Sequence, residues 1–363
     1  MANQTASRAI RNPKTRFNWR VSDCIRQTMV WWYELRARFS GRGYYCSTLA
    51  GQEDYNLTIN SDLTVSCMCQ DYDGSGHIGD LRKNSFEEIY FGPVAQRFRD
   101  ELAKGKLPIP TCSRCTLRRL PTEDAKPPVP RLPYRGMLLE NTVLCNVDCI
   151  GCAREGAAAI RTSKRMSLAE LTQMSDLVAR LGMEQLFYLN LGEPFLSPTI
   201  CQELPILRAK NPDCRIVVST NGVLLNTDAK RAAALNLSHI LFSVHGISDE
   251  MSGEYMLEGS FEKAYAAMKA MAAYRDARGS KKPLLEWKYL LFNWNDRPAD
   301  IQRAIEMAKE IKVDLISFWP THNPFYGMSW RYHLGRMNHI GVKCWKGREV
   351  VLRPENIPLN HIH

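Results

Sequence analysis

The chain has 363 residues, 45% of them apolar, so it can bury a sizeable core and is long enough for one large domain and a smaller one. It has no apolar run of about eighteen residues, and its polar, basic N-terminus does not resemble a signal peptide, so we expect a cytoplasmic protein without a membrane span. The formal net charge of +10 at pH 7 favours anionic partners, although the basic residues are spread along the chain.

The first third of the chain predicts a mixed α and β region. An amphipathic helix is expected from Asp23, whose side chain suits an N-cap. Trp31 and Trp32 on this helix are interpreted as core residues. Residues 55–67, YNLTINSDLTVSC, alternate like two strands joined at the turn NSD.

A second helix and a proline-rich stretch complete this region. Ser85 and Glu88 match a capping box at the start of the helix, and Gly92 followed by Pro93 predicts a break in it. Residues 120–136 contain five prolines, so they can form neither a helix nor a central strand. This stretch is the predicted domain boundary.

Downstream of this boundary, short β-branched or aromatic runs alternate with helical patterns. The predicted strands are 136–145, 185–191, 214–220, 238–244, 284–292 and 313–319. The predicted helices lie near 167–182, 199–210, 227–236, 260–277 and 298–311. Strands separated by helices indicate a parallel sheet, either open and doubly wound or closed into an incomplete barrel.

Polar and glycine residues follow the ends of the predicted strands. They occur at Cys145, 192–194, 221–222, 245–246, 293–296 and 320–324. In both layouts the carboxyl ends of parallel strands carry the reactive groups. We therefore expect an active-site mouth at this edge.

Three of the twelve cysteines form the segment 145–152, CNVDCIGC, spaced C-x3-C-x2-C. In a reducing compartment such spacing indicates metal binding more than disulfides. A structural zinc site takes four ligands, whereas an iron–sulfur cluster held by three thiolates leaves one iron free. Both kinds of site stay open on spacing alone.

This loop resembles that of the radical S-adenosylmethionine (SAM) enzymes, in which it follows the first strand of a partial β/α barrel. The resemblance implies an α/β fold with a partial (β/α)6 TIM-like barrel and a smaller N-terminal α+β domain. It implies a [4Fe-4S] cluster on Cys145, Cys149 and Cys152, whose free iron SAM chelates. One electron would then cleave SAM to methionine and a 5′-deoxyadenosyl radical.

The segment LNLGEP is similar to the GGEP motif on the second strand of these enzymes. The resemblance implies that Gly192, Glu193 and Pro194 bind the SAM amino group. Leu191 stands in place of the first glycine of the motif.

Two further segments resemble motifs on the third and fourth strands. VSTNG implies contacts from Ser219 and Asn221 to the SAM carboxylate and ribose, and FSVHG implies a polar contact from Ser243. His245 stands where many relatives carry Asp, and we retain it as a candidate catalytic residue.

The other cysteine groups precede the boundary. Their spacing fits either a zinc site or a second iron–sulfur site. Residues 46–118 resemble the SPASM or twitch domains that accompany many radical SAM enzymes, although such a domain normally follows the barrel. The resemblance implies an auxiliary [4Fe-4S] cluster with Cys69 as a spare and the ligands Cys46, Cys67, Cys112 and Cys115.

The resulting plan has an N-terminal extension, an auxiliary-cluster domain, a linker, a barrel and a capping tail. Their expected bounds are 1–45, 46–120, 121–134, 135–325 and 326–363. The tail contains Cys344, a candidate for capping the site, ligating a metal or donating a hydrogen atom, with simple burial as the alternative. We expect no additional leader-peptide domain at either end.

Four cysteines would saturate the auxiliary cluster and leave it to accept electrons. The leading hypothesis is therefore oxidation of a small polar metabolite of the sugar, aminocyclitol or nucleoside type, with flavodoxin or ferredoxin as reductant. The alternatives are a peptide-modifying SPASM maturase, a radical epimerase, and a non-catalytic zinc or iron–sulfur module. Nucleic acid is not an expected partner, because no RNA-binding motif accompanies the charge.

Overall fold

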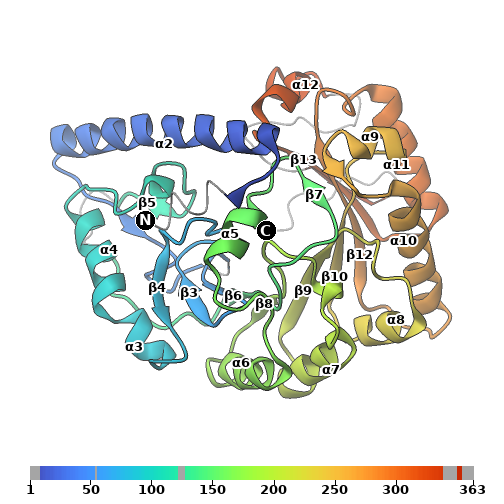
Figure 1. Cartoon of the computed structure of the whole chain (residues 1–363), viewed down its shortest axis with the longest axis horizontal. Coiled ribbons are helices and arrows are strands. Elements are labelled where there is room, and N and C mark those ends of the chain that lie inside the picture. Colours follow the sequence, from blue (N-terminus) through green and yellow to red (C-terminus); the bar gives the residue numbers. More distant parts are fainter. Residues whose placement is uncertain (1–8, 54, 122–126, 338–349, 354–363) are drawn as a thin grey trace. The chain divides into compact units, whose positions relative to one another are not determined.

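The computed structural model describes the whole chain apart from residues 1–8, 54, 122–126, 338–349 and 354–363 (Figure 1). The chain forms two compact units. The first contains Met1–Leu144, Ala153–Gly192 and Lys210–Cys214, and the second contains Cys145–Cys152, Glu193–Ala209 and Arg215–His363. No helix among the described residues is long and apolar enough to cross a membrane.

Helix α2 of the first unit runs from Pro13 to Ser40. The predicted start at Asp23 is wrong, because Asn12 caps the helix and Pro13 occupies its first turn. The Asn12 side chain accepts hydrogen bonds from the backbone of Lys14 and Thr15. Asp23 lies inside the helix, where its carboxylate accepts a hydrogen bond from the Tyr72 hydroxyl at 2.9 Å.

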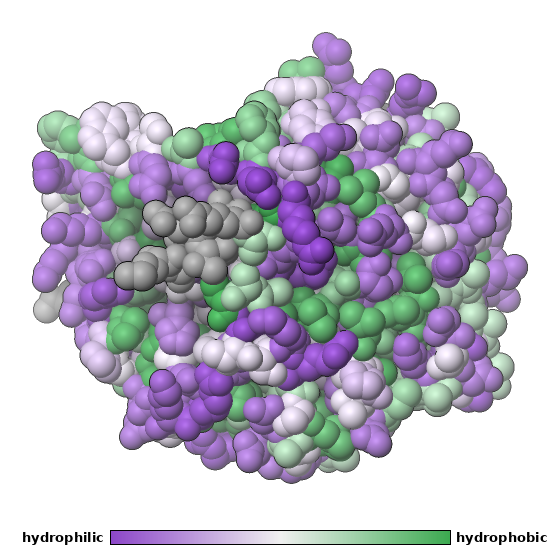
Figure 2. Space-filling model, viewed as in Figure 1, coloured by the Kyte–Doolittle hydropathy of each residue, from purple (hydrophilic) through white to green (hydrophobic). Residues whose placement is uncertain are grey.

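The interpretation of Trp31 and Trp32 as core residues is also wrong, because their exposed fractions are 63% and 57%. Helix α2 buries a different face, on which Ala37 belongs to an apolar cluster and Val30 packs against it. Phe39 of α2 is likewise exposed. Figure 2 shows hydrophobic and hydrophilic residues interspersed over the face of the molecule that it presents.

The sheet of the first unit has the strand order β8-β6-β2-β3-β4 (Figure 1). Its strands are β2 (Thr58–Ile59), β3 (Thr64–Ser66), β4 (His77–Asp80), β6 (Gly136–Leu139) and β8 (Gln185–Phe187). Strand β6 is parallel to β8 and to β2, whereas β2, β3 and β4 are antiparallel. The predicted strand pair at 55–67 is confirmed, and it adds to the same sheet as two of the predicted barrel strands.

The remaining elements of the first unit include two helices separated at Gly92, as predicted. Ser85 and Glu88 form the capping box of the first of them. A Cβ on Gly92 would lie 2.3 Å from the Glu88 carbonyl oxygen, which favours glycine at this break. The elements are α3 (Phe86–Tyr90), α4 (Pro93–Ala103), η1 (Pro110–Ser113), α5 (Arg154–Ile160), α6 (Leu168–Arg180) and the antiparallel pair β1 (Tyr45–Cys46) and β5 (Arg118–Arg119).

The second unit has a sheet of strands in the order β14-β13-β12-β10-β9. Strands β9 (Arg215–Thr220), β10 (His239–Ser243), β12 (Leu284–Leu291) and β13 (Leu315–Pro320) are parallel, and β14 (Val350–Leu352) is antiparallel to β13. The pair β7 (Asp148–Cys149) and β11 (Met256–Leu257) is antiparallel. The helices are η2 (Pro194–Leu196), α7 (Ile200–Lys210), α8 (Asp228–Ala234), α9 (Asp249–Gly253), α10 (Phe261–Asp276), α11 (Pro298–Glu310), η3 (Phe325–Gly327) and α12 (Trp330–His333).

All six predicted strands and all five predicted helices downstream of the linker are present. Hydrophobic side chains on the helix-facing side of β12 explain why helices cover the sheet, since fully buried Trp287 contacts the rings of Phe261 and Tyr265 on α10. The next residue, Lys288, points the other way and lies over the Trp319 ring at 4.3 Å. The fold is α/β, of the partial-barrel type predicted.

Candidate radical and auxiliary cluster sites

The three-cysteine loop of the second unit is held against β11. Cys149 pairs with Met256, and the Ile150 amide donates to the Tyr255 carbonyl at 3.0 Å. Val147 and Ile150 anchor the loop in an apolar cluster, while the three thiols stay half-buried. The loop thus presents three thiols from one short segment, a donor set suited to an iron–sulfur cluster with one free iron.

Gly151, between Cys149 and Cys152 in the sequence, lies where the loop backbone comes close to Tyr255 and Asn323. A Cβ at this position would lie 2.6 Å from the Tyr255 hydroxyl and 3.0 Å from the Asn323 carbonyl oxygen. The Asn323 amide also donates to the Gly151 carbonyl at 2.9 Å. Tyr255 and Asn323 therefore shape the loop. The sequence analysis did not assign this role to either residue, because the only sequence signal was that 320–324 follow a predicted strand.

Asn221 joins the loop to the end of β9. Its side-chain amide donates to the Cys145 sulfur at 3.8 Å and to the Asn146 side chain at 2.9 Å. Its backbone amide donates to the Glu193 carboxylate at 2.8 Å. Three predicted site residues, Cys145, Glu193 and Asn221, are thus brought together within one unit.

The Glu193 carboxylate is buried and is bonded to the chain itself. Besides the Asn221 amide, it accepts hydrogen bonds from the Phe195 backbone at 3.1 Å and the Thr220 hydroxyl at 2.7 Å. Burial raises the pKa of this carboxyl, and these hydrogen bonds oppose the shift. The Glu193 side chain therefore fixes the loop between two strands, and Pro194 begins η2 directly after it.

Gly192 belongs to the first unit. A Cβ there would lie 1.9 Å from the Thr142 carbonyl oxygen, so no larger residue fits without a backbone shift. Ser219 and Ser243 lie on neighbouring strands of the second unit, with their hydroxyl oxygens 2.9 Å apart and half-buried. Direct contacts from these residues to SAM remain predictions.

His245 is buried beside Tyr255 and Phe292, with ring centroids 5.5 Å and 6.5 Å away. Burial, together with the Lys288 charge, lowers the pKa of His245 to about 3. Its Nδ1 accepts a hydrogen bond from the Leu290 amide at 3.2 Å, so the neutral ring carries its proton on Nε2. A catalytic role for His245 stays a prediction, and Cys344 lies outside the described residues.

The cysteines of the first unit gather at a second site. Burial raises the pKa of the Cys67 thiol, and Cys46, Cys112 and Cys115 raise it further through their charge. Burial likewise raises the pKa of Cys46 to about 11 and that of Cys112 to about 12. Ionised thiols so close together need a cation, which makes this donor set suited to an iron–sulfur cluster.

Cys69 has a different surrounding. Burial raises its pKa to about 11, and a hydrogen bond with Tyr55 opposes the shift. Of the four other thiols, only Cys115 acts on it among the causes of this shift. The assignment of Cys67 as the ligand, with Cys69 as the spare, stays a prediction.

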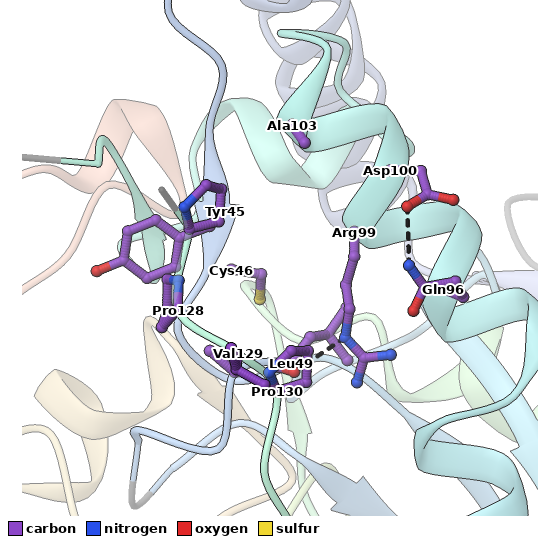
Figure 3. Close-up of a pocket in the computed structure, with 12 residues that line it drawn as sticks. Tyr45, Cys46, Leu49, Gln96, Arg99, Asp100, Ala103, Pro128, Val129 and Pro130 are labelled. Atoms are coloured by element: carbon purple, nitrogen blue, oxygen red, sulfur yellow. Dashed lines mark hydrogen bonds between the residues drawn. The ribbon is translucent and has the colours of Figure 1, made fainter. Parts of the chain in front are cut away.

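A cavity of about 310 Å³ opens beside Cys46. Figure 3 shows the Cys46 sulfur between Tyr45 and Arg99, with Pro128 and Val129 across from the helix. Arg99 donates to the Leu49 carbonyl at 3.1 Å and to the Tyr90 carbonyl at 2.7 Å. One of the four predicted auxiliary ligands thus lines this cavity.

Comparison with known proteins matches the segments that contain the two cysteine groups. A family model described as the radical SAM superfamily matches residues 140–277, and one described as an iron–sulfur cluster-binding SPASM domain matches residues 46–116. The chain therefore contains a radical SAM domain and a SPASM domain. As a radical SAM protein it uses a [4Fe-4S] cluster with SAM and needs a reductant, and its SPASM domain binds a further iron–sulfur cluster.

Curated relatives of this radical SAM protein have different activities. It is 29% identical over 139 residues to mycofactocin maturase MftC of Mycobacterium tuberculosis. This match covers 37% of this chain and 33% of MftC. It is 26% identical over 192 residues to a probable GTP 3′,8-cyclase of Aeropyrum pernix, covering 50% of each. The chain thus spans between a third and a half of the length of these relatives.

Among solved structures, Streptococcus suis SuiB bound to its precursor peptide SuiA is similar over 57% of this chain and 45% of SuiB. The identity is 14% and the TM-score 0.45, a likeness too weak to bear on either site of the radical SAM protein. Within the described part of the chain, no three Cys, His, Asp or Glu side chains converge on a single metal ion.

Proposed function

We propose that this protein is a radical SAM maturase that oxidises a peptide. The supporting observation is the combination of a radical SAM domain with a SPASM domain, together with similarity to a maturase. SPASM domains are frequent in enzymes that modify ribosomally made peptides. When bound, the cluster and SAM supply a 5′-deoxyadenosyl radical that abstracts hydrogen from the substrate.

Residues of the second unit have separate tasks in this proposal. Cys145, Cys149 and Cys152 hold the cluster, and the Asn221 amide stabilises the Cys145 thiolate by donating to its sulfur. Lys288, held over the Trp319 ring, offers a positive charge to a carboxylate of the peptide. The apolar packing of Val147 and Ile150 holds the loop in place.

In this proposal the auxiliary cluster of the first unit accepts the electron that the peptide loses when it is oxidised. A peptide radical that gives up one electron and one proton becomes an alkene or a cross-link. Four thiolates complete the coordination of the auxiliary cluster, so in our proposal that cluster takes up the electron and does not bind the peptide.

A nucleotide is the second candidate substrate. It belongs to the class of small polar metabolites that the sequence analysis expected. Its support is the similarity to GTP 3′,8-cyclases over half of the chain, together with the net charge of +10. The two candidates differ in the origin of the hydrogen that reaches 5′-deoxyadenosine.

The test is anaerobic turnover with SAM and either peptides from cells grown in deuterated medium or deuterated GTP. We expect deuterium in 5′-deoxyadenosine with the peptides and none with GTP. Label from GTP alone would replace the peptide by a nucleotide. The double variant Cys149→Ala with Cys152→Ala should cleave no SAM, whereas Cys112→Ala with Cys115→Ala should cleave some SAM and release no oxidised product.

A further inference from the structure

A group of polar residues in the first unit, all buried except the half-buried Asn190, lies between the auxiliary cysteine loop and the segment that precedes Glu193. Glu140 is central to it, and we refer to the group as the Glu140 cluster. Its members are Asn60, Ser61, Asp71, Glu140, Arg161 and Asn190.

The Glu140 carboxylate follows β6 and is only 1% exposed. One oxygen accepts a hydrogen bond from the Ser61 amide at 3.1 Å, in the turn between β2 and β3, and lies 3.6 Å from the Arg161 guanidinium. The other oxygen accepts from the Asn190 side chain at 3.0 Å and from the Leu191 amide at 3.5 Å. One side chain thus ties the SPASM hairpin to the residues beside Gly192.

Arg161 extends the cluster toward the cysteine loop. It donates to the Asn60 side chain at 2.7 Å and to the Asp71 carbonyl at 3.4 Å. The Asp71 carboxylate accepts hydrogen bonds from Ser66 at 2.7 Å and from the Gly76 amide at 3.1 Å. Both ends of the loop that carries Cys67 and Cys69 are held in this way.

Asn190 makes the shortest link between the two segments. Its side-chain oxygen accepts a hydrogen bond from the Gln70 amide at 3.1 Å, while its nitrogen donates to Glu140. Gln70 follows Cys69 and has a φ of 56°, a left-handed conformation that a non-glycine residue keeps only where its surroundings hold it. The bond to Asn190 is such a support.

We propose that Asn190 is a positioning residue that couples the auxiliary site to SAM binding. A cluster bound at Cys67 fixes the loop through Gln70, and Gln70 then holds Asn190 and, through Glu140, the Leu191 amide. Without that cluster the loop relaxes and the Leu191–Gly192 segment loses one of its supports. The proposal rests on the cofactors of the family and not on the identity of the substrate.

A purely structural role of the Glu140 cluster makes a different prediction. In that case, emptying the auxiliary site and removing the Asn190 side chain would each weaken SAM binding by an amount that does not depend on the other change. Their effects on the SAM dissociation constant would multiply without interaction. A double-mutant cycle distinguishes the two.

The double variant Cys112→Ala and Cys115→Ala empties the auxiliary site without touching the Glu140 cluster. Its effect is measured in three backgrounds, which are the unaltered chain, Asn190→Ala and the control Asn236→Ala. The measurement is the SAM dissociation constant by anaerobic calorimetry on reconstituted protein. Asn236→Ala is the matched control, because this half-buried side chain also donates one hydrogen bond, to the Ala233 carbonyl at 2.9 Å.

We expect the emptied auxiliary site to weaken SAM binding about fivefold or more in the unaltered and Asn236→Ala backgrounds. About fivefold is the lower end of the usual range for energetic coupling between two binding sites. In the Asn190→Ala background the loss should fall below about twofold. Equal losses in all three backgrounds, or no loss in the unaltered chain, would overturn the proposal. Failure to find a labelled peptide product would leave this result standing and would affect only the proposed substrate.

Discussion

Single buried residues in the second unit bond to backbone groups that shape the site. The Glu193 carboxylate accepts hydrogen bonds from two backbone amides and a hydroxyl, and the His245 ring accepts one from the Leu290 amide. Turning such a buried acceptor away from these groups would leave its donors unpaired, which is costly. At this scale the residues nearest the predicted SAM motifs position the backbone.

The neutral state of His245 predicts a pH dependence of stability. Its folded pKa of about 3 lies below the unfolded value of 6.5, so only the unfolded chain takes up this proton as the pH falls. The free energy of unfolding should therefore drop by about 1 kcal/mol from this residue between pH 8 and pH 6. Urea unfolding at the two pH values measures the drop, which His245→Asn should largely remove. His77→Asn, at an exposed position, is the control and should keep it. The same drop in wild type and His245→Asn would contradict the burial of a neutral ring.

At the scale of elements, the strands and helices after residue 135 were predictable because each is a short run with its own pattern. QLFYLNL at 185–191 is apolar and aromatic, whereas 199–210 has helical spacing. The parallel pairing of Thr58 with Leu138 was not predictable, because residues far apart in the chain meet only when the whole sheet packs. The early start of α2 was missed since Asp23 is also a good N-cap residue.

The outward face of α2 supplies a test at this scale. Trp31→Ser and Trp32→Ser should each change the free energy of unfolding by less than about 0.5 kcal/mol, because exposed side chains lose little packing when replaced. Urea unfolding monitored by circular dichroism measures this. Tyr33→Ser is the contrast on the same helix, because Tyr33 packs against the buried cluster and should cost several times more. A large loss at Trp31 or Trp32 would mean that another surface covers this face.

At the scale of the whole molecule, the two predicted cysteine sites belong to different units. The C-x3-C-x2-C set is local in the sequence, whereas the auxiliary set combines the local pair Cys112 and Cys115 with the distant Cys46 and Cys67, which only the resemblance assigns. The Glu140 cluster could not be predicted, because Asn60, Glu140, Arg161 and Asn190 come from four separate segments with no shared motif. Candidate cofactor ligands could therefore be named from the sequence, whereas the residues that support their loops could not.

Separate ligand sets predict separate losses of iron. The unaltered protein should hold about eight iron atoms, the content of two four-iron clusters. Removing Cys112 and Cys115, or Cys149 and Cys152, by alanine substitution should leave about four in each case, and removing all four cysteines should leave almost none. Cys201→Ser, at an exposed cysteine outside both sets, is the control and should keep the full content. Colorimetric iron analysis with mass-spectrometric zinc determination measures this. Zinc in place of iron at Cys112 and Cys115 would exclude an electron-accepting role for the first unit, because zinc has no redox chemistry.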